Sequence, residues 1–160
     1  MITDDIAIAR ALHVLAVVIW IGGVSMATTV MLPAVRRGDL GKDRLHAFDA
    51  IEHRFVWQAR VAVLVVGLSG LYMIWRLDLW DRFQSATFWW MHAMVGVWFL
   101  FTFFLFVAEP FILQRYFRQW AATQPEAAFA RLHRAHWVLL VLSLVTIFGA
   151  VAGTHGWSPF

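Results

Sequence analysis

Residues 11–35 read ALHVLAVVIWIGGVSMATTVMLPAV, a stretch of the chain without a single charged side chain. A helix needs about 20 consecutive apolar residues to cross the hydrocarbon core of a bilayer, so this stretch can span a membrane. Three further apolar stretches lie at residues 55–75, 86–108 and 135–155. Because backbone polar groups must be paired inside lipid, each stretch is predicted to be a transmembrane helix. The expected fold is an all-α integral membrane four-helix bundle that forms one domain over residues 1–160.

The composition of the whole chain leads to the same conclusion. Of the 160 residues, 61% are hydrophobic and 14% are charged, whereas a soluble domain has about 45–50% apolar and about 25% charged residues. So many apolar side chains cannot be buried in a short chain, which makes the lipid bilayer its expected surroundings. The chain has no cysteine, which excludes disulfides, iron–sulfur clusters, thiolate metal sites and covalently attached c-type haem. The net charge of +3 is small and scattered, so nucleic acid is not an expected partner.

The positions of the basic residues predict how the chain is oriented. They are concentrated in the connections at residues 36–54 and 114–134, and such basic connections face the cytoplasm. Both termini are therefore expected on the outer, periplasmic side of the bacterial inner membrane. Apolar residues recur at helical intervals in both connections, so these segments are predicted to contain helix. The basic residues of the two connections are Arg36, Arg37, Lys42, Arg44, Arg54, Arg115, Arg118, Arg131 and Arg134, and those of the opposite side are Arg10, Arg76 and Arg82.

Histidines within the predicted spans are the main candidates for function, because ionisable residues inside a membrane are costly and usually functional. His13 lies near the outer start of the first span, and His92 lies near the outer start of the third. With a rise of about 1.5 Å per residue, both lie about 12–13 Å from the bilayer midplane on the same side. Two imidazoles at matched depth on different helices can ligate one iron from opposite faces. We therefore expect a haem b between His13 and His92.

Small and basic residues near this pair also suit a haem. Gly96 lies one turn below His92 and leaves room for a flat ring. Arg10 lies one turn before His13 and is expected to pair with a haem propionate, for which Arg76 is a second candidate. Glycines are also frequent in membrane helices because they let helices pack closely, so packing is the alternative explanation for Gly96.

A second set of histidines lies at the inner boundary. His53 precedes the second span, and His133 and His136 share one helix face at the start of the fourth. A second haem held by His53 and His136, with His133 as the alternate ligand, would form an electron path across the membrane. The alternative is that all three histidines are solvated residues of the membrane interface.

Two charged residues lie inside the spans near the inner boundary, Arg60 in the second and Glu109 at the end of the third. A charge within a span costs about 2.5–3.5 kcal/mol on insertion scales, so a mutual ion pair is the expected arrangement. In the alternative interpretation Arg60, which shares a helix face with His53, contacts an anion or a quinone near His53, with Gln58 nearby.

Copper is the alternative to haem. Imidazole and thioether groups are suitable ligands of copper(I), and His13, His92 and His155 could form a site of three histidines on the outer side. The methionines lie at different depths along the spans, so packing explains them better than a copper site.

The first span resembles a known group of membrane proteins. Residues 10–15 read RALHVL and residues 19–23 read IWIGG, which is similar to the opening of the CopD-like copper-resistance proteins and of the HemJ-type protoporphyrinogen oxidases. The resemblance implies four membrane spans, with copper uptake or tolerance in the first case and haem b with porphyrinogen oxidation in the second. His13 matches the first-helix histidine of these proteins. The HemJ-type pattern expects a lysine in the third helix, where this chain has His92, and its one lysine, Lys42, lies in a connection.

The function predicted from these features is that of a membrane b-type cytochrome, which carries electrons between the quinone pool and a redox protein through bis-histidine haem. A six-coordinate iron has no open position, which favours electron transfer over substrate binding. One haem is expected, and the inner histidines offer a second site. The alternatives are a copper transport or tolerance protein of the CopD type and a haem-dependent protoporphyrinogen oxidase of the HemJ type. A homodimer, or a place in a larger complex, would shield cofactors better than four helices alone.

Overall fold

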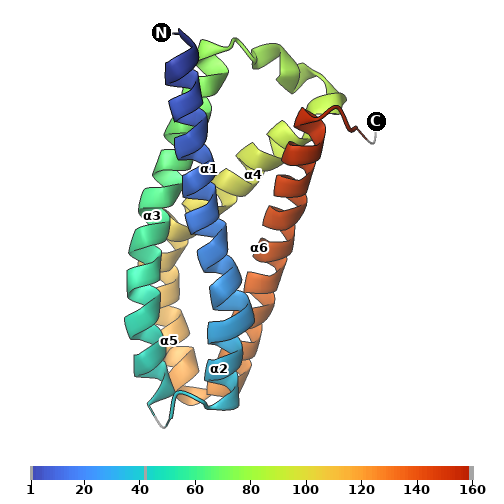
Figure 1. Cartoon of the computed structure of the whole chain (residues 1–160). Helices are drawn as coiled ribbons and strands as arrows, with labels where there is room; N and C mark the ends of the chain where they lie inside the picture. The colour runs from blue at the N-terminus through green and yellow to red at the C-terminus, as the bar shows by residue number, and fades with distance from the viewer. Residues whose placement is uncertain (1, 42, 159–160) are drawn as a thin grey trace.

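The computed structural model describes residues 2–41 and 43–158, and within these ranges the chain is helical with no strand (Figure 1). Four helical stretches are long and apolar enough to cross a membrane, which confirms the prediction of a multi-pass helical protein. The candidate spans are Asp4–Arg37, Leu45–Arg76, Ala86–Phe111 and Pro125–Thr154. Lys42, which the sequence analysis assigned to a basic connection, lies outside the described residues.

The helices extend beyond the predicted spans because both basic connections contain helix, as the periodicity of their apolar residues predicted. The third α-helix begins at Arg44, inside the first connection. A separate short helix forms the first half of the second connection, and the last helix begins within its second half. The elements in chain order are α1 (Ile2–Met26), η1 (Ala27–Met31), α2 (Leu32–Arg37), α3 (Arg44–Arg76), η2 (Trp80–Gln84), η3 (Ala86–Phe88), α4 (Trp89–Phe103), η4 (Phe104–Leu113), α5 (Gln114–Thr123) and α6 (Pro125–Thr154).

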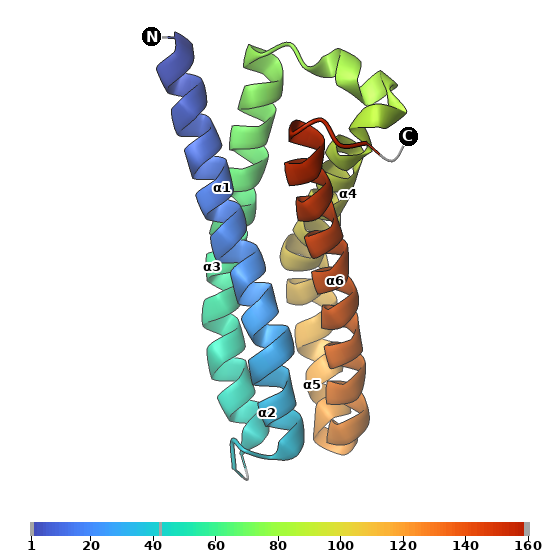
Figure 2. The ribbon, with the colours of Figure 1, turned by 45° about the vertical axis from the view of Figure 1, so that its right-hand side comes forward.

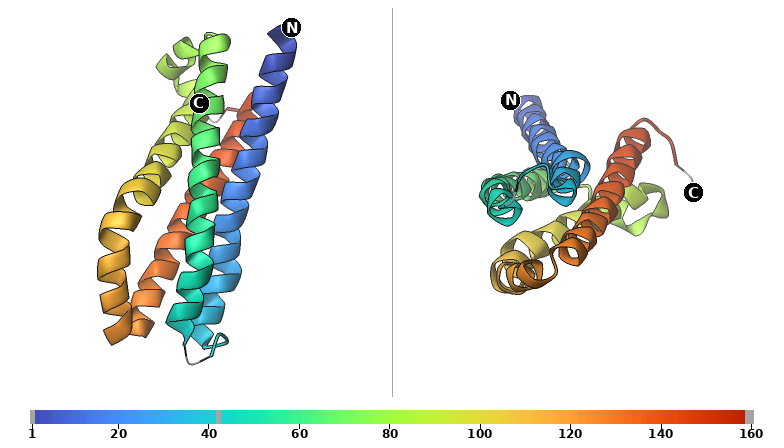
Figure 3. Two further views of the ribbon diagram at one scale, coloured as in Figure 1. Left: turned by 90° about the vertical axis from the view of Figure 1, so that its left-hand side faces the viewer. Right: turned by 90° about the horizontal axis from the view of Figure 1, so that it is seen from below.

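The spans form two antiparallel hairpins, α1 with α3 and α4 with α6 (Figure 2). The view along the bundle shows the hairpins as two separate groups (Figure 3, right). They lie close together near α2 and α5 and diverge towards the termini, which lie at the same end of the molecule (Figures 1 and 2). Where the hairpins meet, Trp20, Val63, Phe101 and Leu140 form a buried apolar cluster.

The outer surface of the spans is rich in large apolar side chains. Val18, Leu68 and Phe148 are examples, with 62%, 69% and 63% of their surface exposed. Such a surface is unfavourable in water and is compatible with contact to lipid. The two hairpins themselves pack closely where a glycine permits it, since Gly67 on α3 faces the ring of Trp98 on α4.

Two of the spans contain a π-helical segment next to a proline. The segment η1 precedes Pro33, and η4 contains Pro110. In a π-helix each N–H bonds to the carbonyl oxygen five residues earlier. Proline has no N–H, so the carbonyl groups of Thr28 and Leu105 lack this partner within their own helices.

A basic side chain from the other hairpin bonds to each of these carbonyl oxygens. His133 Nε2 on α6 lies 2.9 Å from the Thr28 oxygen and, because a carbonyl only accepts, donates to it. Arg60 Nε on α3 donates to the Leu105 oxygen at 2.9 Å. The second helix of each hairpin thus stabilises the first helix of the other. Membrane helices tolerate proline when neighbouring groups satisfy the freed carbonyl, and here both partners come from across the interface.

The variant His133→Ala is expected to lower the free energy of unfolding by about 1–3 kcal/mol, because the buried Thr28 carbonyl loses its donor. Unfolding in mixed detergent micelles would measure the loss. The matched control is His46→Ala, which removes an exposed histidine and is expected to change stability by less than about 0.5 kcal/mol. Equal stability of the two variants would show that the bond to Thr28 contributes nothing.

Candidate functional site

His13 is held in a fixed orientation between α1 and α3. Its Nδ1 lies 3.1 Å from the Val66 carbonyl oxygen and 3.0 Å from the Ser69 hydroxyl oxygen. A carbonyl can only accept a hydrogen bond, so Nδ1 carries the proton and Nε2 has the free lone pair. Nε2 forms no hydrogen bond to any described residue. The ring reaches α3 because Gly70 has no side chain: a Cβ there would stand 3.3 Å from His13 Cε1.

His92 lies at the start of α4 and contacts a different element. Its Nε2 lies 3.0 Å from the carbonyl oxygen of Phe83, and its exposed ring meets the Phe83 ring edge-to-face, with centroids 5.3 Å apart. His13 therefore contacts α3, whereas His92 contacts the connection between α3 and α4. The two histidines lie towards the same end of the bundle, and their joint ligation of one iron stays a prediction. Next to Gly96, no atom lies within 4 Å of the place where a Cβ would stand.

The two arginines considered as propionate partners differ in their surroundings. Arg76 Nη2 forms an ion pair with Asp5 Oδ2 at 2.9 Å, and the Tyr72 hydroxyl donates to the same oxygen at 2.7 Å. This cluster ties the start of α1 to the end of α3. Arg10 is exposed and has no ion pair within residues 2–41 and 43–158. Arg10 is therefore the available cation near His13.

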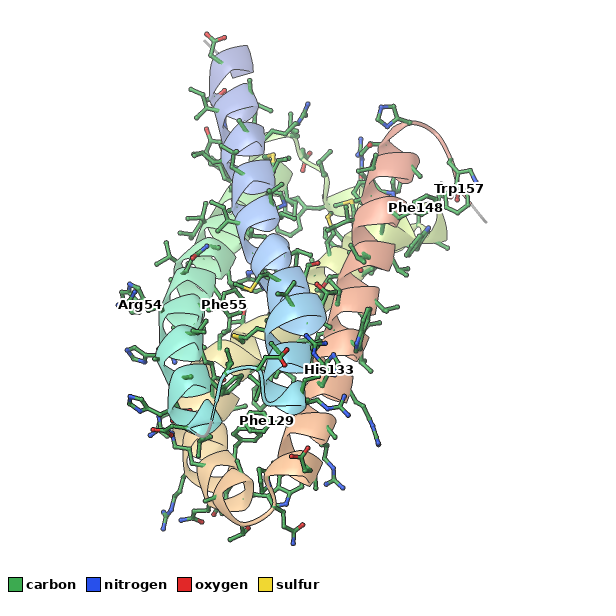
Figure 4. All side chains as sticks on the ribbon, turned by 60° about the horizontal axis from the view of Figure 1, so that its bottom comes forward. Arg54, Phe55, Phe129, His133, Phe148 and Trp157 are labelled. Carbon is green, nitrogen blue, oxygen red and sulfur yellow. The ribbon has the colours of Figure 1, made fainter. Side chains whose placement is uncertain are left out.

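A cavity of about 470 Å³ lies between the hairpins, in the half of the bundle opposite the termini. Its walls come from all four spans and from α5, and they are mostly apolar. Figure 4 shows how α3 contributes: Phe55 points between α3 and α1, whereas its neighbour Arg54 points away from the bundle. The aromatic residues that line the cavity are Trp20, Phe48, Phe55, Phe101, Phe104 and Phe117.

Ionisable residues line one part of the same cavity. Arg118 Nη2 lies 3.3 Å from Asp49 Oδ2. Arg60 Nη2 lies 2.6 Å from Glu109 Oε2, which confirms the expected ion pair. Glu52 is half-buried and forms no hydrogen bond or ion pair with a described residue. The charges that act on it are those of Asp49, Glu109 and Arg118.

The inner histidines differ in what they contact. Both His53 and His136 line the cavity, His53 as an exposed residue and His136 as a half-buried one. His136 Nδ1 donates to the Leu132 carbonyl oxygen at 3.0 Å, so its Nε2 has the free lone pair. His133 uses both ring nitrogens, one for Thr28 and one as the acceptor of Arg36 Nη1 at 2.9 Å. Of the two histidines on α6, His136 is therefore the one available to a ligand.

Trp20 lines the cavity and has an unpaired hydrogen-bond donor. The residue is 4% exposed, and its ring packs edge-to-face on Phe101 with centroids 4.7 Å apart. Its indole N–H is buried and has no acceptor among the described residues. Buried N–H groups are almost always paired, so this one is available to an acceptor that the chain itself does not provide.

Asp49, Glu52 and Arg118 were not predicted as cavity residues, because they lie in segments that were expected to be connections between the spans. A signal was present in the helical spacing of α3. Phe48, Glu52 and Val56 recur every four residues, so a continuation of the second span towards its N-terminus would have placed Glu52 on the inward face.

No group of three or more His, Asp or Glu side chains is placed to hold a metal ion in the part of the chain that the structure describes. The copper site of His13, His92 and His155 therefore gains no support. No family model matches the chain, and no curated protein or solved structure shows significant similarity to it. The resemblance of the first span to the CopD-like and HemJ-type proteins stays a prediction.

Proposed function

We propose that this protein is a membrane b-type haem protein, which carries electrons between the quinone pool and a redox partner. The observation that carries this proposal is the orientation of His13. Histidines that ligate metals usually donate the other ring N–H to a carbonyl group, which fixes the tautomer and the direction of the ligating nitrogen. Val66 and Ser69 hold His13 Nδ1 in this way and leave Nε2 available.

The residues at the terminal end fit the needs of a haem. His92, at matched depth on the neighbouring hairpin, is the proposed second ligand, and the open space beside Gly96 provides room near it. Arg10 would pair with a propionate, since Arg76 is already bonded to Asp5. When bound, haem supplies the one-electron redox centre, and the chain supplies axial ligands, an apolar environment and a partner for the propionates.

The proposed location is the bacterial inner membrane, with both termini in the periplasm. The termini lie at one end of the bundle, and the basic connections lie at the other (Figure 1). This separation supports a cytoplasmic position for the basic end, because arginine and lysine are enriched in cytoplasmic loops. The quinone pool would then be accessible from lipid, and a redox partner would approach the terminal end.

A visible spectrum of the purified protein tests the proposal. The reduced-minus-oxidised spectrum is expected to show the sharp α band of haem b, and the pyridine haemochrome assay is expected to give one haem per chain. A colourless protein would overturn the proposal, and a colourless protein that contains copper would favour the CopD-type alternative.

A further inference from the structure

We propose that the cavity opposite the termini binds the neutral ring of a quinone or quinol, with the indole N–H of Trp20 and the side chains of Glu52 and His136 as its polar contacts. The inference rests on the proposed function in naming the quinone pool, but its site is separate from the proposed haem site. Trp20 follows His13 by seven residues on α1, which corresponds to about 10 Å along the helix axis.

The size and walls of the cavity suit a small aromatic ring. Its volume of about 470 Å³ is within the range of about 300–1,000 Å³ that is usual for sites of small molecules. Phe101, Phe104 and the ring of Trp20 offer flat apolar surfaces. Aromatic rings prefer offset or edge-to-face contacts with one another, so a quinone ring can be held by these walls.

The unpaired N–H of Trp20 indicates what the ligand must provide. Trp20 lines the cavity, and its buried N–H lacks an acceptor among the described residues. A quinone carbonyl oxygen, or the oxygen of a quinol hydroxyl group, is an acceptor of suitable size for an apolar cavity. Glu52, which also lacks a hydrogen-bond partner within the described ranges, would accept from a quinol hydroxyl.

The charges around the cavity favour a neutral ligand over a second haem. Three carboxylates line it, those of Asp49, Glu52 and Glu109. The nearby arginines are already paired, Arg118 with Asp49 and Arg60 with Glu109. A haem brings two further negative charges on its propionates, and like charges in a poorly solvated site repel one another strongly. A quinone or quinol brings none.

The cavity also reaches the lipid-facing surface of the bundle. Phe104, Val138 and Leu142 line it and are 37%, 59% and 44% exposed. These residues belong to η4 and α6, so the rim of the cavity lies on the apolar outer face of the second hairpin. A ligand with an isoprenoid tail can place its ring in the cavity and leave the tail in the bilayer. A water-soluble molecule has no tail and would not need an opening towards lipid.

Saturation binding of radiolabelled decylubiquinone to the haem-loaded protein in nanodiscs tests the inference, with uptake by empty nanodiscs subtracted. The wild type is expected to bind one molecule per chain. Trp20→Phe removes the N–H and keeps an aromatic ring, and it is expected to weaken binding about five- to tenfold, the effect of one hydrogen bond. The matched control is Trp57→Phe on α3, a tryptophan that is 66% exposed, for which no change is expected.

A second variant tests the same inference without changing the buried core residue Trp20, in case Trp20→Phe does not fold. Ala135 lines the cavity and is exposed, so Ala135→Phe would fill the cavity from its rim without disturbing the core. It is expected to weaken decylubiquinone binding at least tenfold while the haem content stays unchanged. Binding that is the same in the wild type, Trp20→Phe and Ala135→Phe would overturn the inference, as would a second haem that is lost in His136→Ala.

The outcome also separates this inference from the proposed function. A colourless protein that binds decylubiquinone in a manner dependent on Trp20 would overturn the haem proposal and support the quinone site. A red protein that takes up no more decylubiquinone than empty nanodiscs would support the haem proposal and overturn the quinone site.

Discussion

Replacement of Arg60 by methionine is expected to lower the free energy of unfolding by about 3–5 kcal/mol, the usual result when one partner of a buried ion pair is removed. Arg60 and Glu109 have side chains that are only 24% and 12% exposed, and their atoms approach to 2.6 Å. Methionine has an unbranched stem of similar shape, so the change removes the charge with little loss of packing. The Glu109 carboxylate would lose the charge of Arg60, and the Leu105 carbonyl would lose its Arg60 donor.

Unfolding in mixed detergent micelles would measure this loss, with Arg54→Met as the matched control. Arg54 lies on the same helix but points away from the bundle (Figure 4), so this substitution is expected to be nearly neutral. The double variant Arg60→Met with Glu109→Met should recover the part of the stability that the uncompensated charge costs, whereas the loss of the Arg60 bond to the Leu105 carbonyl remains. If Arg60→Met were as stable as Arg54→Met, the ion pair would have no role in joining the hairpins.

Arg60 also illustrates how much of the site the sequence could predict. Its pairing with Glu109 was expected because two opposite charges lie within spans at the same boundary, where each needs a partner. The bond to Leu105 was not expected, since it depends on a π-helical segment at Pro110. That segment reflects how the second hairpin packs, and local sequence alone does not determine it.

The membrane spans could be predicted because their signal is a long run of apolar residues, which requires only composition and length. The cavity could not, because it is enclosed by two hairpins from distant parts of the chain. Even the choice between His133 and His136 required tertiary contacts. Both lie on one face of α6, and only the proximity of Thr28 shows that His133 bonds to η1 of the first span.

The second large effect is expected at His13, where substitution by alanine should abolish haem binding. The alanine variant loses the only nitrogen ligand that the first span offers at this depth, and a haem held by His92 alone would be five-coordinate and weakly bound. Haem per chain in the purified variant, measured by the pyridine haemochrome assay, would show the loss. His155→Ala is the control, because His155 is exposed and its Nδ1 bonds to the Val151 carbonyl of the preceding helix α6. Full haem content in His13→Ala would overturn the assignment of this ligand.

Two further measurements distinguish an iron ligand from a histidine that only packs α1 against α3. Ser69→Ala removes one of the two partners of His13 Nδ1 and leaves the ligand in place. Loss of such a partner typically weakens binding about 10–100-fold, so haem should be bound less tightly while the wild-type spectrum is kept. In His13→Gly, added imidazole should enter the vacated space and restore the α band, because it can supply the missing nitrogen. Imidazole cannot replace a purely structural side chain in this way, so an unchanged spectrum after its addition would favour a packing role for His13.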